Sequence, residues 1–152
     1  MEIHTTQKTH TVIVALRDKQ SLESLLDLAC RMANTMNASI LAVHVVEVPV
    51  TLDLSAESDE LDSAGKAVLD EAQRQAHKSF GLISTELIRA RHIGKAIVDE
   101  AKQHRSDLLV VGYCHKSPIS EVLLGSTAQY VMRHAPCRVI VEVPAPVQTM
   151  PV

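Results

Sequence analysis

The sequence predicts an open α/β fold, in which helices cover both faces of one parallel β-sheet. Short apolar runs alternate along the chain with longer segments whose apolar residues recur every three or four positions. Hydrophobic residues make up 46% of the chain and aromatic residues only 2%, so the core is aliphatic. The length of 152 residues indicates a single domain, residues 1–152, because domains hold roughly 100–200 residues. We expect its core at about 11–143 and a flexible, proline-containing tail at 144–152.

The first three elements form a βαβ unit. Residues 10–16 are a strand with an uninterrupted apolar centre, which is typical of a strand buried on both faces. The next helix has Ser21 as a suitable N-cap and ends at Asn37, because Asn tolerates the left-handed backbone conformation. Its inward face consists of Leu22, Leu25, Leu26, Ala29, Met32, Ala33 and Met36. Residues 39–46 are the second buried strand.

The remaining elements repeat this alternation. Residues 49–59 are a surface loop, and a second helix begins near Leu61 and ends at Gly81. Residues 84–90 alternate between apolar and polar, which favours a strand nearer the sheet edge. The later elements are a helix at 94–104, a buried strand at 107–112, a loop at 113–124, a helix at 126–134 and a strand at 137–143. Strands that alternate with helices pair in parallel through right-handed crossovers.

The composition excludes several classes of function. Phe80, Tyr113 and Tyr130 are the only aromatic residues, too few for a platform on which single-stranded bases stack. The formal net charge of −3 lacks the basic excess of a nucleic-acid binder. No apolar run approaches the roughly 20 residues that cross a bilayer, and the polar start has no signal-peptide core. We therefore expect a cytoplasmic protein with no nucleic-acid partner and no membrane insertion.

Catalytic and metal-binding patterns are absent from the sequence. It has no paired carboxylates, no phosphate-binding P-loop and no Gly-x-Ser-x-Gly elbow. The eight histidines and three cysteines show no close metal-ligand spacing, so we expect no metal and no catalytic residue. The cysteines are expected to be free thiols, with Cys30 and Cys137 buried and inert and Cys114 reactive if it is exposed.

The candidate binding site lies beyond the carboxyl ends of the strands, where open α/β sheets bind ligands. Gly112 closes a buried strand, and Gly125, Ser126 and Thr127 open a helix. Ser126 and Gln129 have the spacing of a capping box, so the segment is a plain helix start on one interpretation. On the other, its free N–H groups form an anion site.

Two more residues follow the ends of strands. Arg17 comes after the first strand and is either a solvated loop charge or a cation that projects into the crevice. Val45 comes late in the second strand and is either ordinary core or an apolar wall of the crevice.

Several segments together resemble the universal stress protein family, over about residues 11–143. They are Val12-Ile13-Val14-Ala15, Leu41-Ala42-Val43-His44-Val45, Val110-Val111-Gly112-x-x-His115, Leu123-Leu124-Gly125-Ser126-Thr127 and, as the most specific, His134-Ala135-Pro136-Cys137. The resemblance implies a Rossmann-like fold of the adenine nucleotide alpha hydrolase-like type. Its sheet would have five parallel strands in the order 3-2-1-4-5, and dimers are usual in the family.

The resemblance also implies an adenine nucleotide, ATP or AMP, as the ligand. Nucleotide-binding members carry Gly, two residues, Gly, nine residues, Gly and then Ser or Thr. Gly112, Gly125 and Ser126 match this motif with the right spacing, whereas His115 replaces the second glycine. Such members commonly have Asp at the end of the first strand, where this chain has Arg17.

The altered crevice has its own expected properties. By the resemblance, Ala15 and Leu16 line the base pocket and Val45 lies on the adenine side. Arg17, His115 and Lys116 make the crevice more basic than the usual form. We expect it to keep affinity for an anionic ligand through Arg17, Lys116 and the helix start at Ser126, without tight selectivity for ATP. The alternative is an empty or closed crevice.

The expected partners follow from two further features. Residues 44–49, with Arg91 and His92, are similar to stress-protein domains attached to amino-acid permeases, which implies a transporter as a regulatory partner. The last strand lies at the sheet edge in the family order, so we expect it to form a homodimer. The predicted interface is Arg138, Val139, Ile140, Val141, Glu142 and Val143. The leading function is ligand sensing and regulation in the stress response, and the alternatives are an interaction domain without a nucleotide and a weak ATPase.

Overall fold

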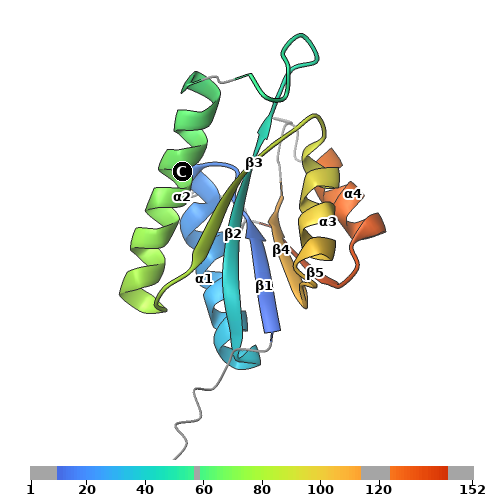
Figure 1. Cartoon of the computed structure of the whole chain (residues 1–152). Coiled ribbons are helices and arrows are strands. Elements are labelled where there is room, and N and C mark those ends of the chain that lie inside the picture. Colours follow the sequence, from blue (N-terminus) through green and yellow to red (C-terminus); the bar gives the residue numbers. More distant parts are fainter. Residues whose placement is uncertain (1–9, 57–58, 114–123, 144–152) are drawn as a thin grey trace, which may run out of the picture.

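The computed structural model describes residues 10–56, 59–113 and 124–143. Within them, five parallel strands form one sheet in the order β3-β2-β1-β4-β5. The elements are β1 (His10–Ala15), α1 (Lys19–Met36), β2 (Ala38–Glu47), α2 (Asp59–Ser79), β3 (Ser84–Ala90), α3 (Ile93–Gln103), β4 (Leu108–Gly112), α4 (Ser126–His134) and β5 (Arg138–Glu142). Helices α1 and α2 cover one face of the sheet, and α3 and α4 cover the other (Figure 1). The predicted fold class and strand order are confirmed.

The strand order creates a switch point at the centre of the sheet. β1 pairs with β2 on one side and with β4 on the other. The chain runs from β1 through β2 to β3 at one edge, and then returns to place β4 beside β1. Connections that leave neighbouring strands in opposite directions open a crevice at the carboxyl ends of those strands. The switch point therefore lies at the ends of β1 and β4.

Two apolar cores are separated by the sheet. Val12 and Val14 belong to the core under α1 and α2, Ile13 belongs to the core under α3 and α4, and all three are fully buried. Successive side chains of a strand point to opposite faces, so a central strand must be apolar at every position. In the edge strand β3, polar residues such as Glu86 and Arg89 interrupt the apolar pattern, as expected for an edge.

The ends of α1 test two predictions about caps. The predicted N-cap, Ser21, is wrong, because α1 begins at Lys19 and Asp18 is its N-cap. The Oδ1 atom of Asp18 accepts hydrogen bonds of 3.0 Å from both the backbone N–H and the hydroxyl of Ser21. Asn37 is confirmed as the stop, because it adopts the left-handed conformation with φ 53° and donates its N–H to the carbonyl of Ala33.

The predicted capping box at the start of α4 is also wrong. Gly125 is the N-cap and Ser126 is the first helical residue, so no side chain caps the helix. The Gln129 side chain donates instead to the carbonyl of Leu124, at 2.6 Å. Other boundaries are shifted by one or two residues, with α2 beginning at Asp59 and α3 at Ile93. Across the described ranges, none of the helices has both the length and the apolar character needed to cross a membrane.

Candidate functional site

A cavity of about 1130 Å³ opens at the carboxyl ends of β1, β2 and β4. Its remaining walls come mainly from the first turns of α3 and α4, and it lies at the switch point of the sheet. We call this cavity the crevice. Ligand pockets measure roughly 300–1,000 Å³, so the crevice has room for a small organic ligand.

The crevice collects most of the binding residues that the sequence predicts. Its lining includes Ala15, Leu16, Arg17, Val45, Gly112, Gly125, Ser126 and Thr127. His115 and Lys116 were predicted as well, and they lie outside the described residues, as does Cys114. The lining residues come from four segments that are far apart in the sequence, and the parallel sheet brings these segments to one edge.

One wall of the crevice is apolar. Val43 and Val111 are buried in the sheet, Ile97 is buried on α3, and all three line the crevice. Val45 is half-buried, packs against the core under α3 and α4, and also lines the crevice. Both interpretations of Val45 therefore apply, since one side of this residue is core and the other is wall.

Two helix N-termini contribute to the opposite side. His92 is the N-cap of α3 and Gly125 the N-cap of α4, and neither makes a side-chain cap hydrogen bond. The first N–H groups of a helix have no partner within it, and the positive end of the helix dipole attracts anions. Of the two interpretations of residues 125–127, the missing capping box favours the anion site.

Lys95 adds a positive charge to this side. It lies in the first turn of α3, lines the crevice and donates to the Oδ2 atom of Asp99 at 2.8 Å. The hydrogen bond to Asp99, together with the charge of that carboxylate, raises the pKa of Lys95. The ammonium group therefore stays protonated at neutral pH. Arg17, which is exposed, supplies a second cation to the lining.

The close approach of α3 to α4 depends on a glycine at the crevice. A Cβ atom placed on Gly94 would lie 2.9 Å from the Cβ atom of Tyr130, which is closer than carbon atoms pack. Both residues line the crevice. The absence of a side chain at position 94 thus determines how near the two helix starts lie to each other.

His44 lies at the floor between the crevice and α2. Its Nδ1 atom is 2.8 Å from the carbonyl oxygen of Leu16, which can only accept, so Nδ1 carries the proton and donates. A Cβ atom on Gly65 of α2 would lie 2.6 Å from the His44 ring. His44 is therefore a packed, half-buried histidine of the crevice.

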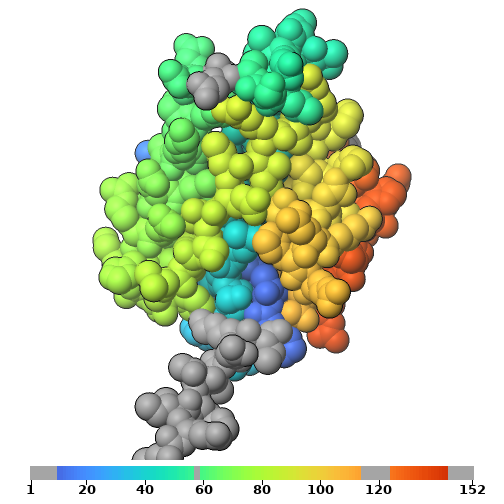
Figure 2. Space-filling view, in the orientation of Figure 1, coloured from blue at the N-terminus to red at the C-terminus, as the bar shows by residue number. Residues whose placement is uncertain are grey.

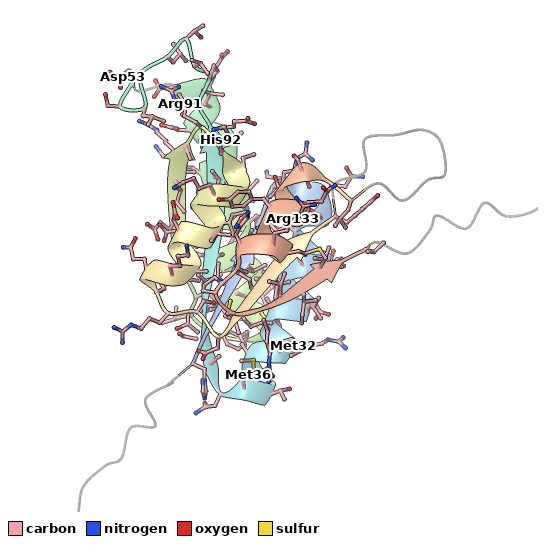
Figure 3. All side chains as sticks on the ribbon, turned by 90° about the vertical axis from the view of Figure 1, so that its right-hand side faces the viewer. Met32, Met36, Asp53, Arg91, His92 and Arg133 are labelled. Carbon is pink, nitrogen blue, oxygen red and sulfur yellow. The ribbon has the colours of Figure 1, made fainter. Side chains whose placement is uncertain are left out.

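The loop between β2 and α2 is tied to the start of α3. The Arg91 guanidinium donates to the carbonyl oxygens of Val48, at 3.2 Å, and of Pro49. Hydrogen bonds from Ser55, and to a lesser extent the charge of Arg91, hold the pKa of Asp53 below its usual range. Figure 3 shows Arg91 and His92 beneath the part of the loop that carries Asp53.

The contribution of α3, and of Tyr130 on α4, to the lining was not predicted from the sequence. The residues that were not assigned to the crevice include Leu61, His92, Ile93, Gly94, Lys95 and Tyr130. A signal for the α3 residues existed, because the rule that ligands bind beyond the carboxyl ends of strands applies to the turn after β3 as well. The sequence contains no such signal for Tyr130, because this residue reaches the crevice through the packing of α4 on α3.

Of the two described cysteines, Cys30 is buried as predicted, whereas the predicted burial of Cys137 is only partial. Cys30 is buried on α1 and Cys137 is half-buried. Burial is the main cause that raises the pKa of both thiols. A protonated thiol is a poorer nucleophile and metal ligand than a thiolate, so the raised pKa disfavours reactivity at both residues.

The predicted dimer residues lie on an exposed edge. β5 pairs with β4 on one side and is the last strand of the sheet. Arg138 is exposed, residues 139–142 are half-buried, and Val143 is 53% exposed. The position at an edge is as expected, and the pairing with a second copy stays a prediction.

Comparisons with known proteins agree on one family. The model of the Universal stress protein family matches residues 8–144. The chain is 30% identical over 119 residues to Universal stress protein MJ0531 of Methanocaldococcus jannaschii, covering 74% of this chain and 69% of that protein. A solved universal stress protein in complex with cAMP is 26% identical, with a TM-score of 0.71, over 90% of this chain and 98% of that one. The Archaeoglobus fulgidus protein in complex with dAMP is 21% identical and shares the fold, with a TM-score of 0.71 over 88% of this chain and 98% of that one.

Proposed function

The chain belongs to the universal stress protein family, and from that premise we propose that it is a small regulatory protein whose crevice binds an adenine mononucleotide. The base would lie against the apolar wall beside Val45, and the phosphate would lie at the starts of α3 and α4. Ligand occupancy would then be the signal that the protein reports.

A single observation carries this proposal. Two helix N-termini without side-chain caps line the same cavity as an apolar wall. Uncapped N–H groups suit a phosphate, and aliphatic side chains suit a purine ring. Lys95, which is paired with Asp99, places an ammonium group beside the helix starts. A mononucleotide matches this arrangement, because its base can face the apolar wall while its phosphate faces the helix starts.

Two of the similar proteins support the choice of ligand. One was solved in complex with cAMP and another in complex with dAMP, and both ligands carry an adenine ring and one phosphate. The sequence departs from the family's ATP motif at His115 and Arg17, and it keeps Gly112, Gly125 and Ser126. A monophosphate ligand therefore fits this chain better than a triphosphate.

Isothermal titration calorimetry tests the proposal, with AMP, cAMP, ATP, adenosine and inorganic phosphate as ligands. We expect AMP to bind more tightly than adenosine or phosphate alone. Lys95→Met should weaken AMP binding by about 10-fold or more, because a hydrogen bond to a charged group contributes roughly 1.5–3 kcal/mol, and should leave adenosine binding unchanged. Lys102→Met, in the last turn of the same helix, is the control and should bind AMP as the wild type does.

An interaction domain that needs no nucleotide is the second candidate. The observation in its favour is an apolar group on the loop between β2 and α2, where Val50 is 89% exposed and Leu52 and Leu54 are about 40% exposed. Exposed apolar side chains that lie together mark contact sites on many proteins. The calorimetry separates the two functions: no heat and no change in melting temperature with any of the five ligands would favour the interaction domain.

A further inference from the structure

Three potential metal ligands meet away from the crevice, between β3 and α3. They are Glu86 of β3 and Glu100 and His104 at the end of α3, and their ligand atoms lie within 4.8 Å of one another. The Nε2 atom of His104 is 3.1 Å from Oε2 of Glu100 and 3.6 Å from Oε2 of Glu86. Figure 2 shows β3 and α3 side by side on this surface.

The fold determines this meeting. Glu86 is in register with Val43 of β2, a residue of the core under α3 and α4, so its side chain points to the α3 face. Glu100 and His104 are four positions apart, which places them on one face of the helix end. Glu86 lies 14 positions before Glu100 in the sequence, so no local spacing reveals the cluster.

The charges of the cluster are poorly balanced in the protein alone. Glu100 is buried, with 9% of its surface exposed, and it faces the second carboxylate of Glu86. Two carboxylates in a partly buried space repel each other, and a cation between them would remove this repulsion.

We propose that Glu86, Glu100 and His104 bind a divalent transition-metal ion of the Zn²⁺ type. In a tetrahedral zinc site with bonds of about 2.0–2.2 Å, neighbouring ligand atoms lie about 3.3–3.5 Å apart. The two separations from His104 Nε2, 3.1 and 3.6 Å, bracket this range, and all three ligand atoms lie within 4.8 Å of one another. A mixed nitrogen and oxygen donor set favours Zn²⁺ over Mg²⁺ and Ca²⁺, which prefer oxygen ligands alone.

The surroundings suit an ion that enters from solvent. The side chains of His104 and Glu86 are 37% and 41% exposed, whereas Glu100 lies deeper. Three protein ligands leave the fourth position to water. The bound ion would cross-link the edge strand β3 to the end of α3, and it would therefore stabilise the folded protein.

The test titrates the full chain, first treated with a chelator, with Zn²⁺ and in parallel with Mg²⁺. We expect Zn²⁺ to raise the melting temperature and to bind at one site with these ligands, and Mg²⁺ to have no such effect. Glu100→Gln and His104→Asn should each weaken Zn²⁺ binding at that site by at least 10-fold. His77→Asn, an exposed histidine on α2, is the control and should bind as the wild type does.

A second measurement keeps the test independent of folding. Glu100→Gln removes the repulsion with Glu86, so in chelator it should melt no lower than the wild type. Co²⁺ in place of Zn²⁺ should give the visible absorption of a tetrahedral site in the wild type and lose it in Glu86→Gln, a partly exposed position. Equal Zn²⁺ affinity in the wild type, Glu86→Gln and Glu100→Gln would overturn the proposal.

Discussion

Gly94 makes the packing of α3 on α4 directly testable, through the substitution Gly94→Ala. The added Cβ atom would lie 2.9 Å from the Cβ atom of Tyr130, about 0.6 Å inside the roughly 3.5 Å at which carbon atoms pack best. The Tyr130 atom is attached directly to the backbone of α4, so no side-chain rotation removes the contact. One of the two helices has to move.

The expected magnitude is a balance of two effects. Overpacking of this kind costs about 1–3 kcal/mol, and the better helix propensity of Ala returns at most about 1 kcal/mol. The free energy of unfolding should therefore fall by about 1–2 kcal/mol. For a chain of this size, that corresponds to a melting temperature lower by about 2–8 °C.

Urea unfolding followed by far-ultraviolet circular dichroism is the suitable assay, because the chain has no Trp. Lys102→Ala, in the exposed last turn of α3, is the control and should change stability by no more than about 0.5 kcal/mol. If Gly94→Ala were as stable as the wild type or more stable, the close approach of the two helices would not be the reason for glycine at this position.

Three other predictions concern caps, pH and assembly. Ser126→Ala should leave stability within about 0.5 kcal/mol by urea unfolding, whereas Asp18→Ala should lower it by about 1 kcal/mol, because only Asp18 makes a cap hydrogen bond. The hydrogen bond from Arg89 lowers the pKa of Asp62. This interaction stabilises the folded protein fully above the unfolded-state pKa of roughly 3.9, and the stabilisation is lost as the pH falls through the lower pKa of the folded state. Asp62→Asn should therefore lose less stability than the wild type between pH 5 and pH 3, as melting curves would reveal, with exposed Asp70→Asn behaving as the wild type. Light scattering at micromolar concentration should give the mass of a dimer, reduced by Val143→Lys at the β5 edge, and a monomer mass for the wild type would contradict the predicted interface.

The fold was predictable because its signals are local. Val12, Ile13 and Val14 are apolar in sequence since both faces of β1 are covered, and Asn37 ends α1 because few residues adopt its backbone conformation. The caps were harder. Asp18 and Ser21 are both good N-cap residues three positions apart, and the sequence does not reveal which one starts the helix.

The candidate site was predictable only where strand topology determines it. Arg17, Val45 and Gly112 follow from the rule that parallel strands end at one edge, and all three line the crevice. Tyr130 and the triad of Glu86, Glu100 and His104 depend instead on how α3 packs against its neighbours. Such contacts between distant segments leave no periodic trace in the sequence.

The division of the helices between the two faces of the sheet determines the order in which these faces become covered during synthesis. Strands β1, β2 and β3 and the helices α1 and α2 all lie before residue 91, so most of one core can form before α3 is made, and Leu108 and Val110 of β4 complete it later. Until α3 and α4 follow, Ile13, Leu41 and Val43 on the other face remain open to water. A nascent chain stalled at this stage would expose an apolar sheet face. Exposed apolar surfaces of this kind are bound by chaperones, and they aggregate when no chaperone covers them.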